Sequence, residues 1–236
     1  MIRKALAFAI GFGLLSSAYA TQWSAGGGAF LGSYFGGGVK ASFFGMTLLE
    51  INYPHTGGGF YGFVDGQYVE FSGGLTFAGG KMDVKSGMGD LFGGGGWDDD
   101  DDDFDLGIPG VGDDIKTSFT FLNFGLLLKY PIEMSESMTL FPAAGINYSH
   151  CMSAKLKAGG MEEEAEDSGD LSRLWFKFGG GADFELSEKM YLRTTLLYGI
   201  GMKNKLEKDL VDMGDGLFNT VTQHGIDIKA GIGFKF

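Results

Sequence analysis

Acidic side chains are the most concentrated chemical feature of this sequence. The first run comprises Asp98, Asp99, Asp100, Asp101, Asp102 and Asp103, and the second comprises Glu162, Glu163 and Glu164. Carboxylate oxygens bind hard cations such as Ca²⁺, which takes about 6–8 oxygen ligands at set geometry. Neither run has the spaced ligands, central glycine and final glutamate of an EF-hand loop. We therefore predict self-repelling surface loops that attract cations weakly, without a dedicated metal site. Ordering of the segment 84–115 by Ca²⁺ is a hypothesis that protease sensitivity in millimolar Ca²⁺ would test.

Histidine and serine offer a second kind of chemistry, namely nucleophilic catalysis. The three histidines are His55, His150 and His224, and none has a metal-ligating partner two or four residues away. His150 is close in sequence to Ser149 and Ser153. A working Ser–His pair must share one face of the chain, whereas an extended strand directs both serines away from His150. We therefore expect no catalytic residues, no cofactor and no enzymatic activity.

A third set of residues combines charges of both signs on one face of alternating segments. Its acids are Glu70, Asp183, Glu185 and Asp227, and its bases are Lys129, Lys177, Arg193, Lys229 and Lys235. Buried charges must be paired or must reach water. If these segments enclose a lumen, the four acids and five bases predict an ion-paired network that plugs it. The alternative is a narrow gated pore.

The elements that carry these charges alternate apolar and small or polar residues with a period of two. At the C-terminus, Ile226, Ile228 and Ile232 alternate with Asp227, Lys229 and Gly231. This pattern predicts a half-buried strand of about thirteen residues, longer than the usual ~5–6. Eight such strands are predicted, over residues 23–35, 58–64, 68–77, 116–130, 138–153, 174–185, 191–202 and 224–236.

The connections between these strands alternate in length. Short turns are predicted at Asp65-Gly66, 133–137 and 187–189, and long loops over 36–57, 84–115, 155–172 and 203–222. Strands of about ten residues with this alternation are typical of transmembrane β-barrels. The rival interpretation is a soluble β-sandwich, whose outward faces would be polar. We predict an all-β protein, an eight-stranded antiparallel transmembrane β-barrel with long extracellular loops and both termini in the periplasm.

The N-terminus has the three regions of a secretory signal peptide. Arg3 and Lys4 precede an apolar run, and Ala18-Tyr19-Ala20 fits the cleavage pattern. We therefore predict a cleaved signal peptide over 1–20 and a barrel domain over 21–236. No later apolar run approaches the ~20 residues of a membrane-spanning helix. The single Cys151 excludes an intramolecular disulfide framework.

Composition and charge restrict the partners. The chain of 236 residues has a formal net charge of −12, which argues against a nucleic-acid partner. Residues 90–114 contain ten acids and 161–170 contain six, and neither stretch contains a base. The charge thus lies in two segments predicted to be outer loops. Nineteen of the 43 glycines fall in the predicted strands, where small inward residues suit a narrow lumen.

The strand pattern and the last residues resemble a known group. A signal peptide, eight strands and an alternating final strand that ends in an aromatic residue look like small bacterial outer-membrane barrels of the OmpX, Opa and OmpW kind. In that group the C-terminal aromatic on the last strand is recognised by the barrel-assembly machinery, and Ile232, Phe234 and Phe236 match this signal. The glycine-rich strands, with 26–28 and 179–181 all glycine, are also similar to spirochaete outer-membrane proteins.

This resemblance implies an integral protein of the bacterial outer membrane, in contact with its lipid and assembled by that machinery. The expected role is a surface interaction, whether adhesion or antigenic display, in which the acidic loops meet a cationic or host surface partner. A small channel for hydrophobic or very small solutes, as the OmpW resemblance implies, is the alternative.

Overall fold

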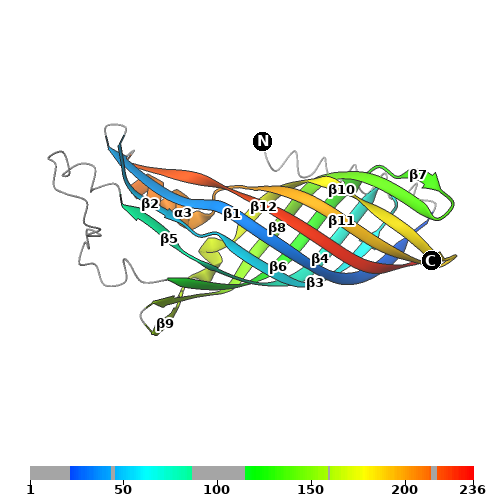
Figure 1. The fold of residues 1–236 in the computed structure, drawn as a ribbon, viewed down its shortest axis with the longest axis horizontal. Helices are drawn as coiled ribbons and strands as arrows, with labels where there is room; N and C mark the ends of the chain where they lie inside the picture. The colour runs from blue at the N-terminus through cyan, green and yellow to red at the C-terminus, as the bar shows by residue number, and fades with distance from the viewer. Residues whose placement is uncertain (1–21, 44–45, 87–114, 159, 214–216) are drawn as a thin grey trace, which may run out of the picture.

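The computed structural model describes residues 22–43, 46–86, 115–158, 160–213 and 217–236. Eight long strands form one antiparallel ring in the order β12-β11-β10-β8-β6-β4-β3-β1, and β12 pairs with β1 to close it (Figure 1). They are β1 (Ser24–Phe43), β3 (His55–Asp65), β4 (Val69–Lys81), β6 (Lys116–Lys129), β8 (Met138–Ala158), β10 (Arg173–Ser187), β11 (Met190–Gly201) and β12 (Phe218–Lys235). The predicted eight-stranded barrel is confirmed.

The outward face of the ring is apolar. Along β12, Ile226, Ile228 and Ile232 are exposed, while Asp227 and Gly231 between them are buried. The most exposed large side chains of the ring strands include Phe60 at 71% and Leu31 at 69%. Such a surface suits hydrocarbon, and the closed ladder leaves no unpaired strand edge within it. Because a soluble sandwich would present polar outward faces, that alternative is excluded.

The described residues also include two helical segments and several short strands. None of the described helices is long and apolar enough to cross a lipid bilayer.

The inward face combines bulky rings with glycine. One buried apolar cluster contains Phe30, Tyr61, Phe63 and Tyr191, and another contains Leu127, Phe141, Ala143 and Leu197. A Cβ atom at Gly225 would lie 2.6 Å from the Tyr34 ring and 3.4 Å from the Trp175 ring. Glycine therefore leaves the space that large inward side chains occupy in this narrow lumen.

The two ends of the ring differ, and we call them the turn end and the loop end. At the turn end, short connections follow β3 and β10, and β7 (Ile132–Ser135) pairs with β8. The C-terminus lies at this end (Figure 1). At the loop end lie β2 (Met46–Asn52), β5 (Asp83–Ser86), β9 (Met161–Glu164), the 3₁₀ helix η1 (Ser168–Leu171) and α3 (Lys205–Met213).

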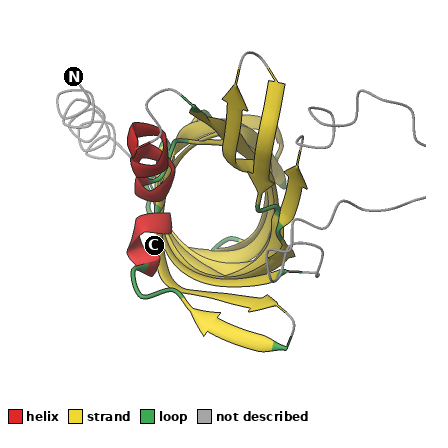
Figure 2. Cartoon of the chain, turned by 90° about the vertical axis from the view of Figure 1, so that its left-hand side faces the viewer, coloured by secondary structure: helices red, strands yellow, loops and turns green. Residues whose placement is uncertain are grey.

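All four predicted long loops contain regular structure in their described residues, which corrects the sequence-based boundaries. Residues 36–57 hold the extension of β1, which pairs with β2, and residues 155–172 hold the β8–β9 hairpin and η1. Residues 203–222 hold α3 and the start of β12. Cross-strand hydrogen bonds extend the sheet beyond the alternating apolar segments from which the strand ends were predicted. The remaining predicted loop, 84–115, begins within β5, and its residues 87–114 lie outside the described residues. Figure 2, which views the ring from the loop end, shows the helices at one side of the rim.

Candidate functional site: the charged lumen

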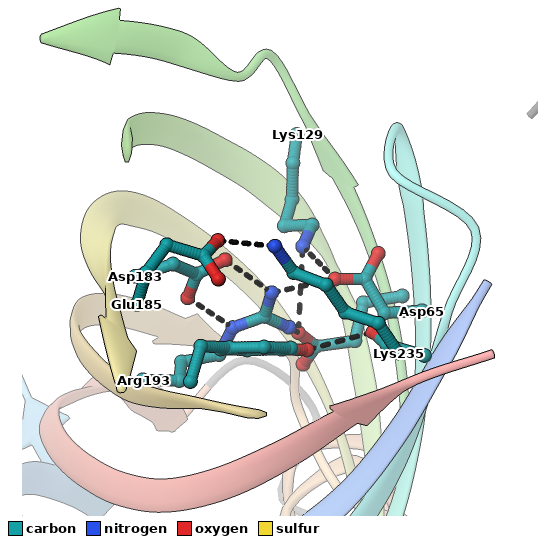
Figure 3. A network of polar contacts seen from close by, with 9 residues as sticks. Asp65, Lys129, Asp183, Glu185, Arg193 and Lys235 are labelled. Atoms are coloured by element: carbon teal, nitrogen blue, oxygen red, sulfur yellow. Dashed lines mark hydrogen bonds and ion pairs between the residues drawn. The ribbon is translucent and has the colours of Figure 1, made fainter. Parts of the chain in front are cut away.

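Arg193, on β11, is the centre of an ion-pair cluster near the turn end (Figure 3). Its side chain is 2% exposed and contacts carboxylates from three other strands. The guanidinium donates to Asp65 Oδ2 at 2.5 Å, to Glu70 Oε2 at 2.6 Å, and to the two oxygens of Asp183 at 2.7 and 2.6 Å. The rings of Phe63, Tyr191 and Phe141 lie 4.8, 5.0 and 5.2 Å from it. A guanidinium presents five donors in a rigid fork, so one arginine can connect several strands.

Two lysines complete the turn-end cluster. Lys129 Nζ lies 2.5 Å from Asp65 Oδ2 and 3.9 Å from Glu70 Oε2, and Lys235 pairs with Glu185. The turn-end cluster is thus defined as Asp65, Glu70, Lys129, Asp183, Glu185, Arg193 and Lys235. Its four acids and three bases leave one excess negative charge beside a vestibule of about 950 Å³.

A smaller group lies further along the lumen. Lys177, on β10, pairs with Asp227 of β12, and the Tyr34 hydroxyl donates to Asp227 Oδ1 at 2.8 Å. Lys229 lies on the same inward face of β12, with its ammonium 5.2 Å from the centre of the Tyr61 ring. Among the described residues, Lys229 forms no ion pair. We call Tyr34, Lys177, Asp227 and Lys229 the mid-lumen group.

The loop-end cluster comprises Tyr53, Arg173, Asn204 and Glu207. Arg173 of β10 and Glu207 of α3 pair at 2.6 Å and are 4% and 1% exposed. The Tyr53 hydroxyl donates to the same carboxylate and accepts from Arg173 at 3.1 Å. Burial raises the pKa of Tyr53 most, Arg173 opposes this, and Glu207 raises the pKa further, so the phenol keeps its proton and stays a donor.

Reciprocal hydrogen bonds between Asn204 and Glu207 start α3. The Glu207 N–H donates to Asn204 Oδ1 at 2.8 Å, and the Asn204 N–H donates to Glu207 Oε2 at 3.1 Å. This is a capping box, which satisfies two helix-terminal donors. Glu207 therefore both caps α3 and fixes it to Arg173 in the barrel wall.

The eight residues predicted to form a lumen charge network all face the lumen. Glu70, Lys129, Asp183, Glu185 and Arg193 belong to the turn-end cluster, and Lys177, Asp227 and Lys229 belong to the mid-lumen group. The structure brings seven of them into ion pairs and leaves Lys229 outside these pairs.

The sequence analysis missed three charged residues of the lumen. Asp65 was assigned to a turn, although it continues the inward series of Tyr61 and Phe63 by one step. Arg173 likewise continues the inward series of Trp175 and Lys177. For Glu207 no periodic signal exists, because its position depends on how α3 packs against β1 and β12.

The two acidic runs have different outcomes. Asp98 to Asp103 lie outside the described residues. Glu162, Glu163 and Glu164 are exposed, but they form β9 rather than a self-repelling loop. Glu162 pairs with Lys155 at 3.2 Å, and Glu164 accepts a hydrogen bond from Ser153 at 2.8 Å. Cross-strand lysines on β8 offset part of this charge, which corrects the prediction for the second run.

His150 has a serine neighbour that strand periodicity did not predict. Ser149 is buried in the lumen, whereas exposed His150 contacts Ser172 across a connection, with Nδ1 and Oγ 3.0 Å apart. The Cys151 N–H donates to the same Oγ at 3.0 Å. A nucleophilic serine requires a base that a third group orients. Within the described part of the chain, no acid contacts His150, so this pair is not an assembled catalytic site.

The three residues that resemble the assembly signal face outward at the end of β12. These residues are Ile232, Phe234 and Phe236. They are 43%, 55% and 77% exposed. Their outward position beside the turn end leaves them accessible to a partner or to lipid.

Comparisons with solved structures find bacterial outer-membrane proteins. Neisserial surface protein A aligns with a TM-score of 0.43 at 10% identity, over 91% of this chain and 97% of that protein. The outer membrane protein OprG of Pseudomonas aeruginosa gives 0.39 at 14% identity, over 92% and 96%. Ail, the attachment invasion locus protein of Yersinia pestis, gives 0.35 at 12% identity, over 90% and 98%. No protein-family model and no curated protein sequence matches the chain.

The architecture follows from the features of the molecule itself. The ring is closed, its exterior is apolar and its polar and charged groups face inward. These are the properties of outer-membrane-type barrels. The chain is an eight-stranded antiparallel transmembrane β-barrel of the kind found in small bacterial outer-membrane proteins.

Proposed function

We propose that this protein is an integral bacterial outer-membrane barrel that acts through its loop end, with a lumen closed to solutes. Export through a cleaved signal peptide over 1–20 belongs to this proposal, and that segment lies outside the described residues. The observation that carries the proposal is that three groups of charged side chains, which we call layers, follow one another along the lumen. The turn-end cluster, the mid-lumen group and the loop-end cluster occupy successive levels of the same interior.

These layers support a plug because their contacts cross the lumen between strands that are not neighbours, or between the wall and α3. Arg193 of β11 contacts β3 and β4, and Lys177 of β10 contacts β12. Between the layers, the described lumen contains two small cavities, of about 20 and 30 Å³. A cavity needs about 10–15 Å³ to hold a single water molecule. Passage of a solute would therefore require the ion pairs to separate.

Planar-bilayer recording tests the plug. We expect no large, defined conductance from the wild-type protein. Arg193→Ala, which removes the centre of the turn-end cluster, should give measurable conductance if Lys177→Ala is introduced with it. A large and uniform wild-type conductance would overturn the plug. It would favour the second candidate function, a channel for small or hydrophobic solutes, for which the vestibule and the two cavities supply the supporting observation.

The loop end supports a surface interaction. The hairpins β1–β2 and β8–β9 extend past the ring, and the chain between β5 and β6 carries the six-aspartate run. An acidic outer surface attracts cationic partners. We propose adhesion or surface display toward a cationic partner, and no enzymatic role.

Binding to immobilised polylysine tests this interaction on intact cells. Replacing residues 98–103 by asparagine should reduce binding several-fold and flatten its salt dependence. Glu162→Gln is the matched control, because Lys155 already offsets that charge, and it should change binding little. Equal binding by the wild type and the 98–103 variant would contradict the proposed role.

Assembly in the outer membrane can be tested at the C-terminus. Phe236→Asp should impair assembly, seen as loss of the folded, heat-modifiable band on gels. The charge replaces an aromatic side chain that is 77% exposed at the outer face of the ring. Lys189→Asp, in a turn of the same end, is the control and should assemble normally. A normal folded yield for Phe236→Asp would count against recognition of this residue by the assembly machinery.

A further inference from the structure

Lys229 is an inward cation that makes no direct ion pair with a carboxylate of the described residues. It lies on β12 and lines a cavity of about 20 Å³ whose other walls come from β1, β3, β4, β6, β8 and β10. Its ammonium lies over the Tyr61 ring at 5.2 Å. A ring face attracts a cation but carries no net charge, so this contact supplies no counter-charge to Lys229.

The neighbouring carboxylates are already occupied. Asp227 accepts from the Tyr34 hydroxyl through Oδ1 and from Lys177 through Oδ2. Glu70, the next acid toward the turn end, is bound by Arg193 at 2.6 Å and lies 3.9 Å from Lys129. Lys229 therefore has to share a carboxylate that has another cationic partner, or find an anion elsewhere.

The charge balance of the lumen is uneven along its axis. The mid-lumen group has two cations and one anion, whereas the turn-end cluster has four anions and three cations. The negative excess borders the wide vestibule, where water and mobile cations can screen it. The positive excess borders the small cavity, where few solvent molecules fit.

The cavity suits one small occupant with hydrogen-bond partners. Its lining includes the polar side chains Ser72, Thr76, Asn123 and Asn147 next to Lys177 and Lys229. Its volume of about 20 Å³ admits an occupant near the size of a water molecule and is too small for sulfate or phosphate. A monatomic halide is larger than a water molecule but smaller than sulfate or phosphate, and it can accept hydrogen bonds from ammonium, hydroxyl and amide donors.

We propose that the mid-lumen cavity binds a single halide ion, chloride in the natural setting, which neutralises Lys229. The site is separate from the acidic loop surface, so it stands or falls independently of the proposed surface role. A bound halide and the Asp227 carboxylate together would balance the two cations of the mid-lumen group.

The test is thermal unfolding of the purified, folded protein in detergent at fixed sodium concentration. Chloride replaces gluconate stepwise, so that ionic strength stays constant. Because an ion that binds only the folded state stabilises it by mass action, the unfolding midpoint should rise with chloride and then saturate. Bromide should act like chloride, and sulfate should not. A midpoint that is independent of chloride would overturn the proposal.

Variants locate the site. Lys229→Met should abolish the chloride response, whereas Lys205→Met, which removes an exposed lysine on α3, should keep it unchanged. Asp227→Asn leaves two cations at the cavity without an acid. The chloride concentration that gives half of the maximal rise in the unfolding midpoint should therefore be lower than in the wild type. An unchanged response in Lys229→Met would refute the site. If Lys229→Met does not fold, the chloride titration of Asp227→Asn tests the site instead. A chloride concentration for the half-maximal response equal to that of the wild type would contradict the proposal as well.

Crystals soaked in bromide provide a direct measurement. Anomalous density in the cavity beside Lys229 is the expected result, and density confined to the protein surface would overturn the proposal.

Discussion

The two ends of the lumen each depend on one buried arginine, but they hold it differently. At the turn end, every partner of Arg193 lies on a strand of the ring or directly at its end. At the loop end, the partner of Arg173 is Glu207, on a helix of nine residues that lies outside the ladder. The first cluster can separate only if the barrel deforms, whereas the second can separate by movement of α3 alone.

This difference determines whether a cluster is lost only when the whole barrel unfolds or can open by a local movement. A charge cluster whose members are all fixed by the ring is lost only with the ring itself. A cluster with one partner on a short helix can open while the ring persists, and such elements typically belong to the low-stability end of a protein. The comparison suggests that α3, rather than the barrel wall, is the movable part of the described lumen.

The largest effect is expected for Arg193→Met. It leaves Asp65, Glu70 and Asp183 close together with only Lys129 to offset them. Removing one partner of a buried ion pair costs about 3–5 kcal/mol. We expect a loss of this order in the free energy of unfolding, measured in urea with the protein in lipid or detergent.

Arg173→Met is the matched variant for the loop end. Here α3 can swing into water and rehydrate Glu207, so we expect a smaller loss, on the order of 1–3 kcal/mol. If both variants lost the same free energy, the distinction between a ring-fixed and a helix-fixed cluster would be wrong.

A smaller, local effect is expected for Glu207→Gln. Glutamine can keep the capping box, because Gln serves at this position of the motif, but it removes the charge that pairs with Arg173. Amide hydrogen exchange in α3 should become faster, while the exchange of β11 and the urea midpoint change little. Slowed or unaltered exchange in α3 would mean that the ion pair does not hold the helix.

The smallest effect is expected for Asn204→Ala, which removes the cap and keeps the ion pair. Loss of an N-terminal cap costs about 0.5–2 kcal/mol. Exchange should increase in the first turn of α3, with Lys208→Ala on the exposed face as the control. If Asn204→Ala released α3 more than Glu207→Gln does, the cap rather than the ion pair would be the main attachment.

Much of the barrel could be predicted because its physics is periodic. In β12, residues 226, 228 and 232 face outward and 225, 227 and 231 face inward, as alternation alone requires. The same parity predicted that Lys177 and Arg193 face the lumen. It would also have found Asp65 and Arg173 if the strands had been extended by one residue.

Other features had no periodic signal. The β1–β2 and β8–β9 hairpins lie past the apolar stretches, where a glutamate run resembles a solvated loop until Lys155 and Lys157 are seen opposite it. The contact between His150 and Ser172 joins residues from a strand and a connection, so strand parity could not predict it.

The sequence by itself determined the closed barrel, the direction of each strand residue and the residue types in the lumen. A period of two has only two outcomes, inward or outward, and hydrophobicity chooses between them. Only the tertiary structure decided which charges meet. Ring closure and strand stagger place Arg193 between β3, β4 and β10 and bring Glu207 of α3 to Arg173. They also leave Lys229 outside the ion pairs of the described residues. Ion pairing depends on distances between strands, and a linear pattern does not contain those distances.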